Sequence, residues 1–148
     1  MQYELHQANL NDYKIISSTF DQYRLFYKQE SDIEGAGKYI KERLKNNEAV
    51  IFFININNKC AGFTQLYPTF DSVRLRKKIV LYDLFVCEEF RRQGFGKVLM
   101  NAAKGYAELN SFGSIELSTA KKNLAGQSLY ESLGYIQDQE FYSYDLEI

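Results

Sequence analysis

The stretch Ile79–Met100, IVLYDLFVCEEFRRQGFGKVLM, constrains the fold more than any other part of the chain. It opens with an almost continuous apolar run, passes through a charged loop containing Gly94 and Gly96, and continues as an amphipathic pattern. The apolar run is typical of a central strand covered on both faces, and the pattern after it predicts a helix. A helix start leaves main-chain N–H groups unpaired, and glycines before it let a ligand approach the backbone. This stretch therefore predicts a phosphate-binding site between a strand and a helix.

Length and composition restrict the class of protein. The 148 residues include one proline and no low-complexity tract, which fits one compact domain over residues 1–148. The formal net charge is −1 and the basic residues are scattered, so we expect no nucleic-acid partner. No window approaches the roughly 18 apolar residues of a membrane span, and the N-terminus lacks a signal-peptide pattern. We therefore expect a cytoplasmic protein without a membrane partner.

The cysteines and the histidine carry no metal-binding pattern. Cys60 and Cys87 stand in apolar, strand-like contexts without CxxC spacing, which favours buried thiols over a disulfide, a metal ligand or a nucleophile. The lone His6 has no matching cluster of ligands, so we expect no metal site.

Periodicity along the whole chain predicts alternating helices and strands. Helices are expected from Tyr13, after Asp32, after Gly94 and after Asn123, and Pro68–Lys78 is expected to be a basic loop, either a solvated face or a contact to a nucleotide 3′-phosphate. The expected strands are Tyr3–Gln7, Ala49–Ile56, Cys60–Tyr67, Ile79–Cys87, Ser114–Ala120, Tyr135–Gln137 and Phe141–Leu146. A hairpin gives antiparallel neighbours, and a strand–helix–strand crossover gives a parallel pair. The order therefore predicts an α/β fold of the mixed α+β kind, with a central mixed sheet of six to seven strands flanked by about four helices.

Two common phosphate loops do not fit the spacing. A P-loop requires GxxxxGK[ST], but Val98 follows Gly96-Lys97 and no glycine stands five residues before Gly96. A dinucleotide-binding loop requires GxGxxG directly after a strand, but Leu99 occupies the third glycine position. The pattern that remains is R-x-x-G-x-G, from Arg91 to Gly96.

This pattern and its context resemble the GNAT N-acetyltransferase superfamily, which transfers an acyl group from acetyl-coenzyme A to an amine. DLFVCEEFRRQGFGKVLM resembles the coenzyme-binding motif of that family, and NLAGQSLYESLGY resembles its C-terminal motif, in which Tyr130 follows Asn123 by seven residues. The resemblance covers essentially the whole chain in element order and is strongest from Tyr82 to Tyr135. It implies a GNAT-like mixed sheet and a single acetyltransferase domain over residues 1–148.

The resemblance also implies which residues bind acetyl-coenzyme A, the cosubstrate. The backbone of Leu84–Val86 would pair with the pantetheine arm, and the main-chain N–H groups of Arg92–Lys97 would hold the pyrophosphate. Glu88 stands where the family usually has proline. The residues assigned to the coenzyme are Leu84, Phe85, Val86, Arg91, Arg92, Gln93, Gly94, Phe95, Gly96, Lys97, Asn123 and Tyr130.

Three residues receive roles in acyl transfer. When an amine attacks a thioester, negative charge grows on the carbonyl oxygen and then on the departing sulfur. The backbone N–H of Val86 would stabilise the oxyanion, and the phenol of Tyr130 would act as general acid toward the sulfur; otherwise Tyr130 is a packed aromatic. Asp83, a carboxylate inside an apolar strand, is a base or an anchor for the amine if the acceptor approaches its face, and otherwise a structural carboxylate. Strand alternation puts the Asp83 side chain on one face of the sheet and the side chains of Tyr82, Leu84 and Val86 on the other face.

The sequence thus leads to an N-acetyltransferase, an acyltransferase whose acceptor is a primary amine. The acceptor is a small-molecule amine such as a polyamine, or a lysine-like amino group of a protein or peptide. The alternative is a non-catalytic module that binds or senses acyl-coenzyme A with the same fold. Closing strands such as Phe141–Leu146 can pair across a two-fold axis, which leaves a homodimer open.

Overall fold

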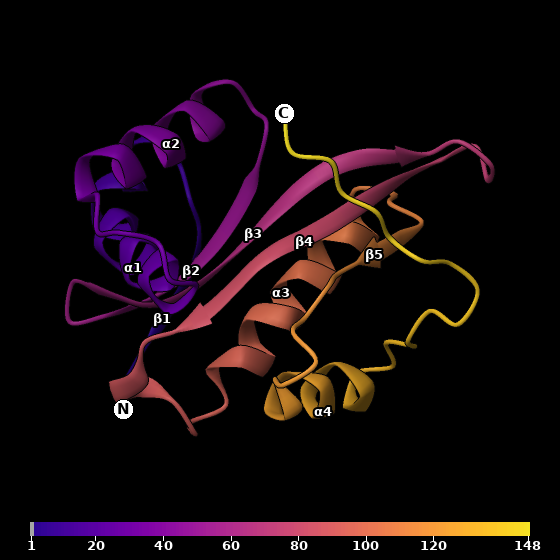
Figure 1. Cartoon of the computed structure of the whole chain (residues 1–148). Helices are drawn as coiled ribbons and strands as arrows, with labels where there is room; N and C mark the ends of the chain where they lie inside the picture. Colours follow the sequence, from indigo (N-terminus) through magenta and orange to yellow (C-terminus); the bar gives the residue numbers. More distant parts are fainter. Residues whose placement is uncertain (1) are drawn as a thin grey trace. The chain divides into compact units, whose positions relative to one another are not determined.

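The computed structural model describes residues 2–148, which fall into a larger unit ending at Ser118 and a smaller unit, Thr119–Ile148. The larger unit is built on a sheet with the strand order β1-β2-β3-β4-β5 (Figure 1). Neighbours are antiparallel from β1 to β4, whereas β4 and β5 are parallel. The predicted mixed sheet is therefore confirmed. The strands are β1 (Glu4–Gln7), β2 (Val50–Ile56), β3 (Lys59–Asp71), β4 (Arg76–Val86) and β5 (Ser114–Glu116).

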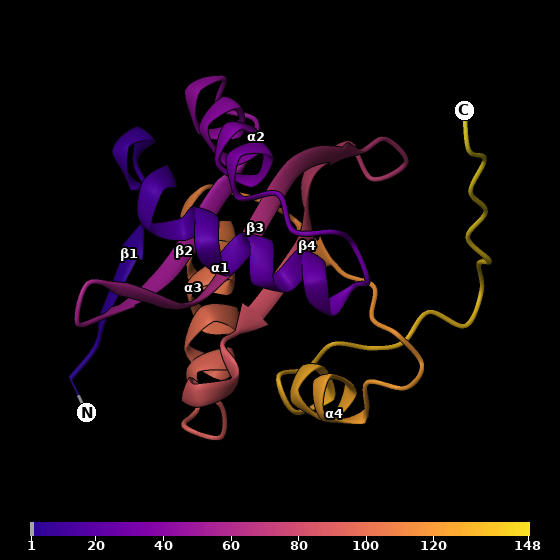
Figure 2. The ribbon, with the colours of Figure 1, turned by 60° about the vertical axis from the view of Figure 1, so that its left-hand side comes forward.

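Helices cover both faces of this sheet (Figure 2). Helix α1 (Tyr13–Phe26) follows a short 3-10 helix, Leu10–Asp12, and packs beside α2 (Ile33–Lys45) on one face. Helix α3 (Phe95–Leu109) covers the other face, where Phe95 and Leu99 pack against apolar residues of β2 and β3. None of the helices described for residues 2–148 is long and apolar enough to span a bilayer.

An extra residue in β4 sets the direction of its side chains. Gln65 of β3 pairs with Asp83, but the next residue, Leu66, pairs with Leu81, so Tyr82 is left over as a β-bulge. After the bulge, Asp83 and Phe85 point toward α1, because Phe85 belongs to the core cluster of α1 and α2. The bulge therefore turns the carboxylate toward the helical layer of α1 and α2.

The hairpin of β3 and β4 is longer than the sequence analysis predicted. Pairing continues through Phe70 with Lys77 and Asp71 with Arg76, so most of Pro68–Lys78 is strand and the loop prediction was wrong there. Asp71 closes the turn: its carboxylate accepts from the Arg74 N–H at 3.2 Å and pairs with Arg76 at 3.3 Å. Arg74 and Arg76 thus pair within the hairpin, whereas Lys78 pairs with Glu116 of β5 at 3.5 Å.

The smaller unit contains one helix, α4 (Leu124–Ser132), within the described residues. The segments Tyr135–Gln137 and Phe141–Leu146, predicted as closing strands, are irregular, so the described residues contain five strands where six to seven were expected. Their apolar side chains are exposed, with Ile136 and Tyr144 both at 93%. A strand is stable only when it pairs with another strand. The alternation of apolar and polar residues in these segments does not show whether such a partner exists.

Candidate active site

The loop between β4 and α3 presents main-chain N–H groups at the start of a helix. A second 3-10 helix, Glu88–Phe90, leads into it, and Gly94 stands at the N-cap with a left-handed φ of 83°. The first helical hydrogen bond runs from the Val98 N–H to the Gly94 carbonyl at 3.1 Å, so the N–H groups of Phe95, Gly96 and Lys97 precede it. A Cβ on Gly94 would meet nothing within 4 Å, so the space beside its Cα is open. The backbone here fits an anionic group such as a pyrophosphate.

The side chains of this loop differ in environment. Arg92, Gln93 and Lys97 are exposed, whereas Phe95 is buried and its ring meets the ring of Tyr3 edge-on at 5.1 Å. Phe95 can therefore offer a ligand its main chain only. Arg92 adopts a left-handed φ of 62°, an uncommon conformation for a residue with a Cβ.

Arg91, the first residue of the pattern, turns toward the protein. Its Nε donates to the Val86 carbonyl at 2.8 Å, and its main-chain N–H donates to the Glu88 carbonyl at 3.2 Å. The guanidinium lies 5.4 Å from the ring centroid of Phe85 and 5.9 Å from that of Phe26. The Arg91 side chain thus joins the end of β4 to the end of α1.

The last residues of β4 have one open edge. β5 pairs with β4 only at Lys78, Ile79 and Val80, so no strand among residues 2–148 pairs with that edge beyond Val80. On the other edge, the Cys87 N–H donates to the Ala61 carbonyl in β3 at 2.9 Å. Because successive N–H groups of a strand point to opposite edges, the Val86 N–H points to the open edge. The same alternation directs the Leu84 N–H to the open edge and the Phe85 N–H to β3.

Asp83 is a buried carboxylate with two protein donors. It is 4% exposed, Gln65 Nε2 donates to its Oδ2 at 2.8 Å, and the Tyr23 hydroxyl also bonds to it. Burial raises the pKa of Asp83, and the bonds from Gln65 and Tyr23 offset part of that increase. The other amide atom, Gln65 Oε1, is buried without a hydrogen-bond partner within the described part of the chain. The surroundings of Asp83 thus favour its protonated form and leave an acceptor oxygen in need of a donor.

Tyrosines gather on the same face of the sheet as Asp83. Burial and the Asp83 charge raise the pKa of Tyr23. The hydroxyls of Tyr39 and Tyr67 lie 2.7 Å apart, and the Tyr82 ring lies 5.6 Å from the Tyr67 ring. Tyr82, which is 68% exposed, therefore lies on the face of Asp83, although alternation had assigned it to the opposite face. The bulge at Tyr82 explains this correction, and a carboxylate among aromatic rings suits a cationic amine.

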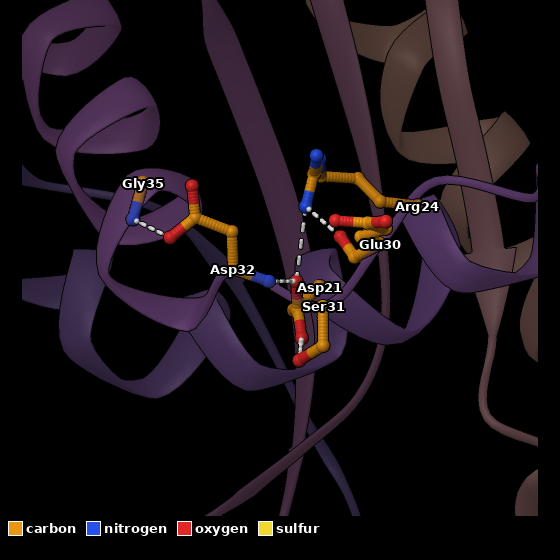
Figure 3. Close-up of polar contacts among 6 residues, drawn as sticks. All are labelled: Asp21, Arg24, Glu30, Ser31, Asp32 and Gly35. Carbon is orange, nitrogen blue, oxygen red and sulfur yellow. Dashed lines mark hydrogen bonds and ion pairs between the residues drawn. The ribbon is translucent and has the colours of Figure 1, made fainter.

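Asp21 fixes the connection between α1 and α2 (Figure 3). It is 3% exposed and accepts hydrogen bonds from Ser31 Oγ at 2.6 Å, the Asp32 N–H at 2.8 Å and Arg24 at 3.1 Å. Arg24 also donates to the Glu30 carbonyl at 3.0 Å. These donors lower the pKa of Asp21, the bond from Ser31 most of all. The cluster holds the end of α1, which carries Phe26.

In the smaller unit, Asn123 is the N-cap of α4, as the sequence analysis predicted. Its Oδ1 accepts from the Gly126 N–H at 3.0 Å, and its Nδ2 donates to Thr119 Oγ1 at 3.0 Å. A Cβ on Gly126 would lie 2.4 Å from Asn123 Nδ2, so a larger residue there would require the Asn123 side chain to shift. Tyr130 lies within α4, and its ring centroid is 6.2 Å from that of Tyr135.

Two residues of the site were missed at the sequence level. Neither Tyr23 nor Gln65, the two residues that hydrogen-bond to Asp83, belongs to a motif that the sequence analysis identified. Both became recognisable only through the register that puts Gln65 opposite Asp83 and the packing that brings α1 over β4. The two cysteines, by contrast, are buried free thiols, as predicted.

Comparisons with known proteins agree with one another. Residues 13–135 match the Acetyltransferase (GNAT) family. An uncharacterized N-acetyltransferase of Bacillus subtilis (strain 168) is 43% identical over 144 residues, which cover 97% of both chains. A probable acetyltransferase of Haemophilus influenzae is 25% identical and covers 89% of each chain. The crystal structure of a probable acetyltransferase matches with a TM-score of 0.91 and 35% identity, over 98% of this chain and 97% of the other.

Proposed function

Because the chain belongs to the acetyltransferase (GNAT) family and is an N-acetyltransferase, we propose that it transfers the acetyl group of acetyl-coenzyme A to a primary amine by direct attack in a ternary complex. The acceptor is a small amine or polyamine, or a lysine-like amino group of a protein or peptide. The open edge of β4 at Leu84–Val86, followed by the Gly94 loop, is the observation that carries the proposal.

The donor site uses main-chain groups. The pantetheine arm adds to the open edge of β4 as an extra strand would, with the Leu84 N–H available to the arm and the Val86 N–H to the thioester carbonyl at its end. The N–H groups at the start of α3 and the positive end of its dipole suit the pyrophosphate. Asn123 and Tyr130 belong to this site by the resemblance of their motif. The bound coenzyme supplies an acetyl thioester.

The acceptor site uses the face of Asp83. An ammonium is attracted by the Asp83 carboxylate and by the faces of nearby tyrosine rings, and its N–H groups meet the acceptor need of Gln65 Oε1. An amine with a pKa of about 10 is mostly protonated at pH 7 and must lose a proton before it attacks. A carboxylate with a raised pKa is a better base than an exposed one, and we assign Asp83 this role or that of anchor.

In the chemical step, three groups of the protein act on the reacting atoms: the Val86 N–H, the Tyr130 phenol and the Asp83 carboxylate. The neutral amine nitrogen attacks the thioester carbonyl carbon, and the Val86 N–H stabilises the oxyanion. The carbon–sulfur bond breaks as the carbonyl re-forms, and the sulfur takes a proton from the Tyr130 phenol. Asp83 first releases the proton of the ammonium to solvent. It then takes the excess proton from nitrogen, directly or through water, and passes it to the Tyr130 phenolate, so that the products are an acetamide and free coenzyme A and both side chains return to their starting states.

The acid role of Tyr130 has its own test. Tyr130→Phe is expected to lower kcat by about 100-fold, because general acid catalysis contributes on that order, with little change in coenzyme affinity. Tyr144→Phe, at an exposed position of the C-terminal segment, is the matched control. Unchanged turnover in the Tyr130 variant would remove the acid role and leave a packing role.

The proposal as a whole is tested by calorimetric titration with acetyl-coenzyme A and by thiol release with polyamines, amino acids and peptides bearing free amino groups. We expect saturable binding and thiol release that depends on one class of amine. Failure to bind at millimolar concentration would contradict the proposal. Tight binding without amine-dependent thiol release would instead indicate a coenzyme-binding or sensing module.

A further inference from the structure

We infer that Arg91 is a positioning residue that holds the end of β4 in the geometry needed for oxyanion stabilisation, and that its side chain is not a pyrophosphate ligand. The inference rests on the proposed function, because it takes acetyl-coenzyme A as donor and the Val86 N–H as the oxyanion contact. It changes the role that the R-x-x-G-x-G pattern gave to its first residue.

The peptide group that joins Val86 to Cys87 is hydrogen-bonded on both sides. Its carbonyl accepts from Arg91 Nε at 2.8 Å, and its N–H, which belongs to Cys87, donates to the Ala61 carbonyl at 2.9 Å. β4 ends at Val86 and the chain then turns into the 3-10 helix Glu88–Phe90. Without Arg91, the last strand residue would be held from the β3 side only. Arg91 therefore supplies the second support at the point where the strand leaves the sheet.

The carbonyl and the N–H of Val86 point to the same edge of β4. In a strand, a residue that pairs through its carbonyl presents its N–H to that same side. The Arg91 bond thus fixes the orientation of the residue whose N–H we assign to the oxyanion. A displacement of about 1 Å at such a donor can cost on the order of 100-fold in rate, so this support matters for turnover more than for ligand binding.

The guanidinium also lies over the faces of two aromatic rings. It lies 5.4 Å from the ring centroid of Phe85, which follows Asp83 by two residues, and 5.9 Å from that of Phe26 at the end of α1. The same end of α1 is held by the Asp21 cluster. Arg91 therefore links the strand end that meets the donor with the helix end on the acceptor face.

A shortened acetyl donor can show whether the Arg91 side chain positions Val86 or binds the pyrophosphate. Acetyl-pantetheine keeps the thioester and the pantetheine arm but has no pyrophosphate or adenosine. A residue that binds pyrophosphate affects turnover of acetyl-coenzyme A alone, whereas a residue that positions Val86 affects both donors. Arg91→Lys is the informative variant, because lysine keeps a charge able to meet phosphate but lacks the Nε–H that bonds to the Val86 carbonyl and the guanidinium that lies over the Phe85 ring.

The experiment measures kcat and KM for both donors, and the dissociation constant of coenzyme A, in wild type, Arg91→Lys and Arg91→Gln. We expect both variants to lower kcat about tenfold or more with either donor and to change the dissociation constant less than about threefold. Lys45→Arg, at an exposed position at the end of α2, is the control. Circular dichroism and thermal unfolding verify that each variant is folded, and Arg91→Lys is the more conservative of the two.

Two results would overturn the inference. One is a loss of turnover with acetyl-coenzyme A that disappears with acetyl-pantetheine, accompanied by weaker binding of coenzyme A, which would make Arg91 a phosphate ligand. The other is unchanged kcat for Arg91→Lys with both donors. A wild-type protein that binds acetyl-coenzyme A but releases no thiol with any amine would contradict the proposed function itself.

Discussion

At Asp83, folding stability favours the protonated carboxyl group, whereas the proposed role in acyl transfer needs the charged carboxylate. Burial raises its pKa, and the bonds from Gln65 and Tyr23 do not fully compensate. A carboxyl group with a raised pKa in the folded state holds its proton more tightly there than in the unfolded chain. Its contribution to stability is therefore present at low pH and is lost as the pH rises through the folded-state pKa. At neutral pH, the charge that the proposed role of Asp83 requires therefore costs stability.

This conflict gives the first prediction. Asp83→Asn is expected to lower kcat/KM by about 100-fold or more while leaving the free energy of unfolding at pH 7 no lower than that of the wild type. The Gln65 amide can rotate to present its unpaired Oε1 to the new side-chain N–H. Urea unfolding and steady-state kinetics measure the two effects.

The pH profile adds a second readout for the same residue. In the wild type, kcat/KM should fall as the pH drops through the raised pKa of Asp83, and this acidic limb should be absent from the residual activity of the Asn variant. Asp145→Asn, in the exposed C-terminal segment, is the control. A destabilised Asp83→Asn protein with normal turnover would show that Asp83 is a structural carboxylate.

At the scale of elements, two glycines of α3 offer a matched comparison. Gly94 has a φ of 83° at the N-cap, whereas Gly105 lies inside the helix, and a Cβ at either position would meet nothing within 4 Å. Gly94→Ala is expected to destabilise the fold by about 1–2 kcal/mol because of the left-handed backbone. Gly105→Ala should stabilise it by about 1 kcal/mol because alanine has the higher helix propensity.

The two variants should also differ in coenzyme binding. Gly94→Ala disturbs the turn that presents the N–H groups of α3, so it should weaken acetyl-coenzyme A, whereas Gly105→Ala should leave the affinity unchanged. Calorimetric titration and urea unfolding give both quantities. Equal affinities in the two variants would mean that the Gly94 turn does not contact the coenzyme.

The connection between α1 and α2 depends on one carboxylate. Asp21→Asn removes the charge and replaces one carboxylate oxygen by an NH2 group, so that the donors on that oxygen, either Ser31 or the pair of Arg24 and the Asp32 N–H, lose their acceptor; we expect a loss of about 2–3 kcal/mol in unfolding free energy. Because its hydrogen bonds lower the pKa of Asp21, its contribution is present above the unfolded-state pKa and lost as the pH falls through the folded-state value. The difference between wild type and variant should therefore shrink in acid. A difference that is constant with pH would contradict this account.

Elements with their own local signals were predictable from the sequence. The α3 start followed from Gly94, the α4 cap from Asn123, and the hairpin from the turn at Asn57-Asn58-Lys59. The extension of β3 and β4 through the basic segment was missed, because cross-strand pairing and the Asp71 ion pairs outweigh the polar composition there. The β-bulge at Tyr82 has no signal in the sequence, and it decides which side chains accompany Asp83.

At the scale of the whole molecule, the chemistry is distributed over distant parts of the sequence. The donor edge at Leu84–Val86 and the Gly94 loop belong to the larger unit, and Asn123 and Tyr130 belong to the smaller one. The motifs that carry these residues were recognisable because main-chain binding and a capping Asn need fixed local spacings. The partners of Asp83 were not, because Gln65 comes from β3 and Tyr23 from α1 through tertiary packing, and the same holds for the Phe26 ring beside Arg91.

The central claim is that the amine attacks the thioester directly while both substrates are bound. Initial rates of thiol release over a matrix of acetyl-coenzyme A and amine concentrations test it. We predict double-reciprocal lines that intersect and no thiol release without amine. Parallel lines, with one equivalent of thiol released before the amine is added, would show an acetyl-enzyme intermediate and contradict the proposed mechanism.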